Sequence, residues 1–293
     1  MALLIGAAIG GVTLGLIYGF LGFSIVLLYK ATGVANFAQG NIATFATFLV
    51  YFVIKGTGLN IYAAIAIGVP MALALGAALY FLTIRFNDDA GPMNLTVRTL
   101  ALYLLLGSVM TSSFGAGQPF PFPSALPSGS FDLQTYVRLP EATLVILIAA
   151  LLLGGASWLF FKRSTMGLFM RAMAEDPEVA ELLGVRSRAV TALAWAIAGT
   201  VSLFVGVFIA PTALLSSNMT DLFLMYAFTG VVVGGLTSLP GAFVGGIVVG
   251  LVQDVTAVYL GGDESVLAVF ILLIAVLLYR PHGIFGEAVA ERL

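Results

Sequence analysis

Residues 140–161 read PEATLVILIAALLLGGASWLFF, and residues 162–186, which follow directly, read KRSTMGLFMRAMAEDPEVAELLGVR. The first stretch meets the requirement of roughly 18 apolar residues for a membrane-spanning helix. The segment 162–190 then holds nine of the chain's 12 basic and 14 acidic residues. Together they predict a helix that crosses a bilayer and leads into one large charged loop, an arrangement typical of a membrane protein that meets a soluble partner.

The composition extends this interpretation to the whole chain. Of the 293 residues, 60% are hydrophobic and 9% are charged, whereas soluble domains carry about 25% charged residues. With a mean hydropathy of +1.10 the chain could not hide its apolar surface in a soluble fold. The net charge of −2 argues against nucleic acid as a partner, and the absence of cysteine excludes disulfides and thiolate metal sites.

The apolar segments predict an all-α polytopic membrane protein with eight or nine transmembrane or re-entrant helices and a single transmembrane domain over residues 1–293. The segments do not alternate polar and apolar residues as barrel strands do. The first lacks the basic region and cleavage site of a removable signal, so we interpret it as a membrane helix. The candidate spans are residues 4–29, 36–54, 60–84, 95–114, 140–161, 190–213, 222–237, 240–260 and 264–279.

The distribution of basic residues predicts the orientation, because cytoplasmic loops carry an excess of Lys and Arg. If segment 162–190 is cytoplasmic, only Lys55 and Arg138 fall outside, and the N-terminus is outside and the C-terminus cytoplasmic. The basic residues that then lie inside or at the inner boundary are Lys30, Arg85, Arg98, Lys162, Arg163, Arg171, Arg186, Arg188, Arg280 and Arg292.

Two of the candidate spans are ambiguous. Residues 222–237 would form about 24 Å of helix, which is short of a bilayer core of roughly 30 Å. A turn signal at 237–241 joins them to 240–260, so the pair is either a full or a re-entrant hairpin. Segment 36–54 begins with Asn36 and Gln39. Their side chains need hydrogen-bond partners that lipid cannot supply, so protein or a cavity must surround them.

The connection 115–139 is the longest on the predicted outer side. Its prolines at 119, 121, 123 and 127 favour an extended, stiff path. A structural loop and a docking surface for an external partner both fit this pattern.

Glycine residues recur at four-residue spacing, a pattern that lets membrane helices approach closely. They indicate tight packing, within the chain or at a subunit interface, and do not identify an activity. Around the ambiguous hairpin the packing candidates are Gly230, Gly234, Gly235, Gly241 and Gly245.

The sequence shows no catalytic set. His282 is the only histidine and cysteine is absent, which disfavours a zinc site or a Cys–His nucleophile. No glycine is followed by lysine, so the phosphate-binding loop of P-loop ATPases is missing. Asp221, Asp254 and Glu141 each lie toward a helix end rather than at mid-membrane, where ion-coupled transporters place ionisable groups. A transporter of this sequence would therefore take its energy from another protein.

A short helix is predicted inside the charged loop. Asp176 is a helix-capping residue, Pro177 suits the first helical position, and Gly184 is a natural stop, which together predict a helix over 177–183. Its apolar face consists of Val179, Leu182 and Leu183, and Glu178 and Glu181 lie beside it. A helix of this length is unstable alone in water. It therefore either rests on its own bundle or on lipid, or fits a groove on a cytosolic motor.

Residues 171–185 resemble the coupling-helix signature of permeases in the branched-chain amino-acid family of ABC importers. Further motifs occur in the family's order. The run NFAQG at 36–40 resembles N-F-A-[QH]-G-E, and Ala198-Gly199 opens the expected helix after the coupling loop. The pairs Gly234-Gly235, Pro240-Gly241 and Gly245-Gly246 resemble the family's glycine-rich hairpin, and RPHGIFG at 280–286 resembles R-P-x-G-[LI]-F-G. The motifs extend over residues 36–286.

The resemblance implies the shorter of two paired permeases, a transport subunit that is not an enzyme. Its implied partners are a second permease in a heterodimer, two ABC ATPase subunits that bind ATP and Mg, and an external solute-binding protein. The chain itself would hold no cofactor and would be a multi-pass protein of a bacterial-type cytoplasmic (inner) membrane. The family handles leucine-like amino acids, urea, short amides, and some aromatic or carboxylic acids.

The resemblance also assigns candidate residues. Those for ATPase coupling are Arg171, Glu175, Asp176, Pro177, Glu178, Val179, Glu181, Leu182, Leu183 and Gly184. Those for the solute path or its gate are Asn36, Gln39, Gly40 and Asn41, where Asn41 replaces the Glu frequent in the family. The alternative for these polar side chains is hydrogen bonding between helices. The alternatives for the whole chain are a secondary transporter or channel, a membrane scaffold, and an intramembrane enzyme.

Overall fold

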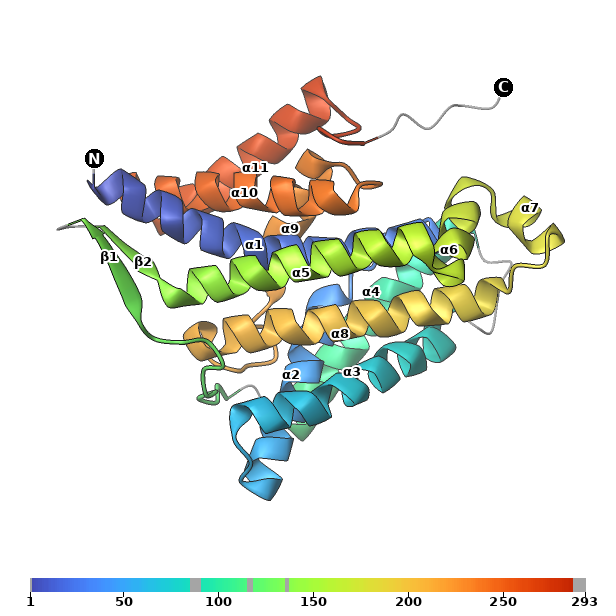
Figure 1. Ribbon diagram of the computed structural model, residues 1–293, viewed down its shortest axis with the longest axis horizontal. Helices are drawn as coiled ribbons and strands as arrows, with labels where there is room; N and C mark the ends of the chain where they lie inside the picture. The colour runs from blue at the N-terminus through green and yellow to red at the C-terminus, as the bar shows by residue number, and fades with distance from the viewer. Residues whose placement is uncertain (1, 85–90, 115–117, 135–136, 287–293) are drawn as a thin grey trace. The chain divides into compact units, whose positions relative to one another are not determined.

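The structure is a computed structural model that describes residues 2–84, 91–114, 118–134 and 137–286. These residues form helices α1 (Ala2–Thr32), α2 (Gln39–Thr57), α3 (Ile61–Thr83), α4 (Pro92–Ser113), α5 (Glu141–Arg163), α6 (Thr165–Glu175), α7 (Pro177–Leu182), α8 (Ser187–Ala213), α9 (Asp221–Gly234), α10 (Leu239–Tyr259) and α11 (Gly262–Tyr279), and strands β1 (Ser130–Gln134) and β2 (Val137–Pro140). Figure 1 labels these elements. Arg85 and Arg292, which entered the prediction of orientation, lie outside the described residues.

Eight of the described helices are long and apolar enough to cross a membrane: α1–α5, α8, α10 and α11. The predicted all-α polytopic fold is therefore confirmed. At 14 residues α9 is shorter than these, and it spans about 21 Å at 1.5 Å per residue. Residues 36–38 precede α2 instead of belonging to it, so this span begins three residues later than predicted.

The contacts divide the chain into two compact units, each built from separate stretches of sequence. Unit 1 comprises Met1–Val26, Leu126–Gly154 and Leu224–Leu293, and unit 2 comprises Leu27–Ala125 and Gly155–Phe223. The chain passes between the units within α1, α5 and α9, and once more between residues 125 and 126, before β1. Each unit is described by itself below, and a single domain over 1–293 stays a prediction.

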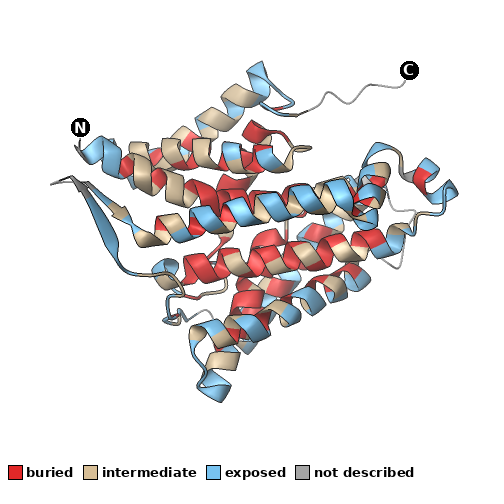
Figure 2. Cartoon of the chain, viewed as in Figure 1, coloured by how far each residue is buried: buried red, intermediate tan, exposed pale blue. Residues whose placement is uncertain are grey.

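In unit 2, α8 packs against both α2 and α3. Glycine makes the α3–α8 crossing possible, because a Cβ on Gly76 would lie 2.8 Å from the carbonyl carbon of Trp195, and one on Gly199 would lie 2.9 Å from the Ala72 oxygen. In the most apolar window of α8, 67% of residues are buried, against 11% for α5. Figure 2 shows this contrast between the mostly red α8 and the mostly blue α5. The two helices are similarly apolar, so only their packing distinguishes them.

In unit 1, α10 packs against the first part of α1 and against α9 through glycines on both sides. A Cβ on Gly15 would lie 2.7 Å from the Gly246 oxygen, and one on Gly230 would lie 3.0 Å from Gly246 Cα. Gly234 lies against Gly241, and Gly245 against Gly230. Four of the five predicted packing glycines therefore lie at the α9–α10 contact within the chain.

The segment after α11 caps the C-terminal end of α9. The backbone N–H of Ile284 donates to the Val233 oxygen at 2.9 Å, and that of Phe285 donates to the Gly234 oxygen at 3.0 Å. These carbonyls end a helix and have no partner inside it. Gly235 and Gly283, with φ of +108° and +75°, supply the left-handed turns that the contact requires. The fifth packing glycine, Gly235, thus contacts the motif at 280–286.

The two strands lie within the predicted outer connection and pair antiparallel, with Phe131 opposite Leu139. Arg138 Nε lies 3.0 Å from Asp132 Oδ1 across the pair. The prolines at 119–127 occupy a non-helical stretch before this hairpin. The prolines predicted an extended path, but the two strands were not predicted, because cross-strand pairing depends on residues several positions apart and no Asn-Gly or Asp-Gly turn marks it.

Candidate functional site

The charged loop contains two helices, of which only the second was predicted. Ser164 Oγ accepts from the N–H of Gly167 at 2.9 Å and caps α6. Gly167 lets α6 turn back on α5, since a Cβ there would lie 2.7 Å from Phe161 Cα. Met170 and Met173 are buried. Ser164 before apolar residues at 166, 170 and 173 was the available signal for α6.

Helix α7 begins and ends where the capping residues predict. Asp176 Oδ1 accepts from the N–H of Val179 at 3.1 Å, and Pro177 is the first helical residue. Gly184 has a φ of +88° and its N–H donates to the Glu181 oxygen at 2.9 Å. The helix ends at Leu182, one residue earlier than expected.

The apolar face of α7 points away from its own unit. Leu182 is 87% exposed, Leu183 80% and Val179 48%, whereas Ala180 is 2% exposed. The coupling candidates Arg171, Glu175, Glu178, Glu181 and Gly184 are also exposed, and Asp176 is half-buried. Figure 1 shows α7 projecting past the ends of α6 and α8. Helix α7 is thus a short, partly apolar projection in which Ala180 is buried and the leucines face outward.

Behind α7 lies an open groove of about 140 Å³. Glu181 lines it from α7. The remaining lining residues come from the ends or first turns of four long helices, α1, α3, α4 and α8: Ala31, Thr32, Tyr80, Ile84, Leu95, Ser187, Arg188 and Thr191.

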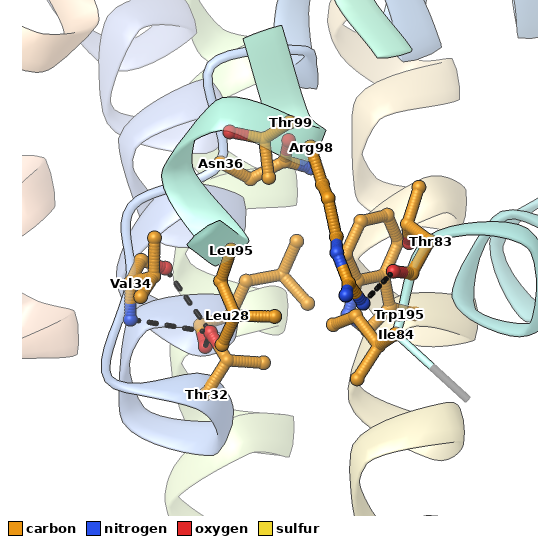
Figure 3. Close-up of a pocket in the computed structure, with 10 residues that line it drawn as sticks. All are labelled: Leu28, Thr32, Val34, Asn36, Thr83, Ile84, Leu95, Arg98, Thr99 and Trp195. Atoms are coloured by element: carbon orange, nitrogen blue, oxygen red, sulfur yellow. Dashed lines mark hydrogen bonds between the residues drawn. The ribbon is translucent and has the colours of Figure 1, made fainter. Parts of the chain in front are cut away.

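A smaller cavity of about 10 Å³ shares Thr32, Ile84 and Leu95 with that groove, and this space is about what one water molecule needs. Figure 3 shows Arg98 running beside Trp195, with Arg98 Nη1 donating to the Thr83 oxygen at 2.9 Å. Asn36 also lines the cavity. The two spaces therefore border the same residues, and Asn36, which precedes α2, lines the smaller one.

Two of the predicted path residues are fully engaged inside the protein. Asn36 Nδ2 donates to Gln39 Oε1 at 2.8 Å, and Asn36 Oδ1 accepts from the N–H of Ala38 at 3.0 Å. Gln39 Nε2 donates to Ser202 Oγ at 2.6 Å and to the Ala198 oxygen at 3.2 Å. Asn36 and Gln39 are 1% and 0% exposed. This geometry favours the packing alternative for both residues.

Asn41 differs from these two. Its Nδ2 donates to the Tyr103 oxygen at 2.6 Å, but its Oδ1 is buried and has no hydrogen-bond partner among the described residues. Gly40 beside it is buried. A buried acceptor without a partner costs about 1–3 kcal/mol.

Asn41 belongs to a polar cluster that the sequence analysis did not assemble. The hydroxyl of Tyr103 donates to Asp221 Oδ1 at 3.2 Å. One turn after Asn41, the hydroxyls of Thr44 and Thr220 lie 2.8 Å apart. Asn41 and Thr44 come from α2 and Tyr103 from α4. Asp221 is the first residue of α9, and Thr220 lies immediately before it. Asp221 was noted in the sequence only as an acid at a helix end, and no local pattern pointed to Tyr103.

Buried polar side chains inside a set of membrane-length helices, together with a protruding helical loop, are the features of a multi-pass membrane protein with an internal polar cluster. The family model described as the permease component of the branched-chain amino acid transport system matches residues 7–278. The chain belongs to this family of permeases.

Individual relatives agree with this assignment. The branched-chain amino acid transport system permease protein LivH of Escherichia coli is 29% identical, covering 97% of this chain and 96% of its own. The permease protein BraD of Pseudomonas aeruginosa is 26% identical over the same shares. A solved structure, PsaBC from Streptococcus pneumoniae in complex with Fab, aligns over 94% of this chain and 91% of the other with a TM-score of 0.48 and 14% identity.

Proposed function

We propose that this chain is the transmembrane permease subunit of an ATP-driven importer for a small solute, coupled through α7 to separate ATPase subunits. The observation that carries the proposal is the exposed apolar face of α7, with Leu182 and Leu183 at 87% and 80% exposure on a helix of six residues. Exposing leucines of this kind to water is energetically unfavourable, and we propose that an ATPase subunit, rather than lipid, covers them.

The family membership supplies the rest of the assembly. Permeases whose names place them in branched-chain amino acid transport systems are components of larger systems. The proposed partners are a second permease, two ATPase subunits that bind ATP and Mg, and an external solute-binding protein. The proposed setting is the cytoplasmic (inner) membrane, with α6 and α7 in the cytoplasm and the N-terminus outside. A branched-chain amino acid is the first solute to test.

The groove behind α7 supports a route for the coupling. Glu181 faces the same space as Thr32 of α1, Tyr80 of α3 and Thr191 of α8. Because packed interiors transmit displacement instead of absorbing it, an ATPase that moves α7 would shift the ends of these helices.

The test replaces Leu182 with Asp in the assembled transporter. We expect ATP-driven leucine uptake per inserted protein to fall by about tenfold or more, the ratio that corresponds to loss of one buried leucine from a contact. Abundance in the membrane should not change, because Leu182 is 87% exposed. Leu168→Asp on α6 is the matched control, since Leu168 is 53% exposed on the same loop but outside α7.

Equal uptake by Leu182→Asp and the control would refute the assignment of α7. Uptake that continues without ATP hydrolysis and stops when an ion gradient is dissipated would instead establish a secondary transporter.

A further inference from the structure

Helix α5 contains two consecutive glycines, Gly154 and Gly155, that have no packing role among the described residues. A Cβ added to either would find no described heavy atom within 4 Å outside its own turns of helix. Glycines in other long helices differ from this pair, since a Cβ on Gly76 of α3 would lie 2.9 Å from Ala196 Cα. The glycine pair of α5 therefore serves no close approach to another described helix.

Glycine in the middle of a helix weakens it, because a residue without a Cβ loses the most conformational freedom when the helix forms. Two in succession lower the preference for helix about fifteenfold relative to alanine, at about fourfold each. Sharp bends in long helices are almost always found at proline, at glycine or serine pairs, or at bulges. The pair is therefore the position at which α5, unbroken from Glu141 to Arg163 in this structure (Figure 1), bends most easily.

The two halves of α5 are held differently. The buried residues of α5 are Thr143, Ile146 and Ala150, and all of them precede the glycine pair. Thr143 Oγ1 also lies 2.7 Å from Thr13 Oγ1 of α1, where either hydroxyl can donate to the other. Beyond the pair, residues 156–163 are half-buried or exposed. Packing thus fixes the first half of the helix, whereas the second half has no buried side chain.

The second half of α5 is joined closely to the loop that follows it. The N–H of Ser164 donates to the Phe160 oxygen at 3.0 Å. Gly167 brings the start of α6 against the same turn, with a Cβ there 2.7 Å from Phe161 Cα. The boundary between the two compact units also lies between the two glycines of the pair. The second half of α5 therefore belongs with α6 and α7, and the first half does not.

We propose that the glycine pair is a hinge within α5, at which the second half of the helix bends together with α6 and α7 while the first half stays fixed to α1. The inference rests on the proposed function, because such a hinge lets the α7 segment follow an ATPase subunit without pulling the packed half of α5 out of its contacts. A few residues at a hinge absorb the change in backbone angles that a rigid helix would pass on.

The experiment measures the distance between two spin labels on α5 in the purified transporter, assembled with cysteine-free partner subunits. Val145→Cys and Leu159→Cys place labels at exposed positions on either side of the hinge, and the chain has no cysteine of its own. In a straight helix these positions lie about 21 Å apart, at 1.5 Å per residue. We expect two distance populations whose proportions change when ATP is added.

Gly154→Ala combined with Gly155→Ala should leave one distance population, because the two alanines favour the straight helix about fifteenfold. No neighbour has to move, since the added Cβ atoms meet open space. Abundance in the membrane should therefore be unchanged or higher. ATP-driven uptake per inserted protein should fall by up to the same factor, and by up to about fourfold for each single substitution.

Two controls match this design. Glu264→Cys and Leu278→Cys give a label pair of the same spacing on α11, whose most apolar window is 11% buried, as is that of α5. No glycine lies between these labels, so they should show one distance population with and without ATP. The second control is Gly6→Ala on α1. A Cβ at Gly6 also meets open space, and this variant should leave uptake unchanged.

Three results would overturn the hinge: one distance population in the unchanged protein with and without ATP, two populations that persist in the double alanine variant, or loss of the second permease from the purified complex of that variant. The last would establish the glycine pair as a contact with a partner helix. The populations without ATP are a property of α5 and decide the hinge even if the unchanged transporter shows no ATP-driven uptake. Uptake is measured separately and decides the proposed function.

Discussion

Helix α7 and the start of α2 depart in opposite directions from the usual distribution of polar and apolar residues. On α7 two leucines stand at 87% and 80% exposure, whereas before and within α2 Asn36, Gln39 and Asn41 are at most 2% exposed. Exposure of the α7 leucines to water is energetically unfavourable unless another molecule covers them. The polar side chains at the start of α2 are stable inside the protein only where each polar atom has a hydrogen-bond partner. Functional sites are expected where such local rules are broken.

The comparison separates an outward-facing apolar surface from polar groups packed inside the protein. Between α7 and its own unit the buried contact is made by Ala180, so changes on its outer face should affect assembly with a partner and leave the fold intact. At the start of α2, changes affect hydrogen bonds between helices, and their effect depends on whether the altered atom was already paired. The following predictions test these differences, beginning with the largest expected effect.

The first concerns the side of the membrane on which α7 lies. The chain has no cysteine, so Ala174→Cys on α6 and Ser128→Cys before β1 can be labelled without background. Both positions are exposed. In intact cells a membrane-impermeant thiol reagent should label Cys at 128 and leave Cys at 174 unlabelled until the membrane is opened. The reverse pattern would place α7 outside and exclude docking of a cytoplasmic ATPase.

The second tests Gln39 as a packing residue. Gln39→Leu leaves Asn36 Nδ2 and the Ser202 hydroxyl without their partners, each a loss of about 0.6–2 kcal/mol within a membrane. We expect a several-fold lower amount of inserted protein and unchanged solute selectivity in the remainder. Ser202→Ala removes one bond of the same network and should have a smaller effect. A changed selectivity at normal abundance would move Gln39 to the solute path.

The third, with the smallest effect, tests the charge next to the apolar face of α7. Glu178 is exposed on α7, and Glu178→Lys exchanges its charge without disturbing a packed contact. Exposed charge pairs contribute about 0.2–1 kcal/mol, so uptake should fall two- to fivefold, with a stronger reduction at low salt. Arg171→Glu, an exposed charge exchange on α6, is the comparison variant. If uptake by both variants does not depend on the salt concentration, apolar contact alone holds the partner.

Much of the fold could be predicted from residues close together in the sequence. The eight membrane-length helices follow from apolar length, and the ends of α7 follow from Asp176, Pro177 and Gly184. The packing glycines followed from their four-residue spacing. The strands were missed because their pairing crosses a turn without a strong signal. Helix α6 was missed although Ser164 and the apolar residues at 166, 170 and 173 signal it.

The candidate site also has one part that could be predicted from the sequence and one that could not. The residues of α7 were predictable because capping and periodicity act over one or two turns. Which polar atom near α2 stays unpaired was not predictable, because Gln39 meets Ser202 163 residues further along the chain and Asn41 meets Tyr103 62 residues further along.

By itself, the sequence determined that this is a multi-pass helical membrane protein of the branched-chain amino acid permease family, with a capped helix in its charged loop. These properties depend on hydrophobic length, local backbone preferences and short motifs, all of which act between near neighbours. Only the tertiary structure decided that the leucines of α7 face outward, that Gln39 is satisfied, and that Asn41, Tyr103 and Asp221 come together. These depend on contacts between distant segments, which burial and the need to pair every polar atom select only when the whole chain has packed.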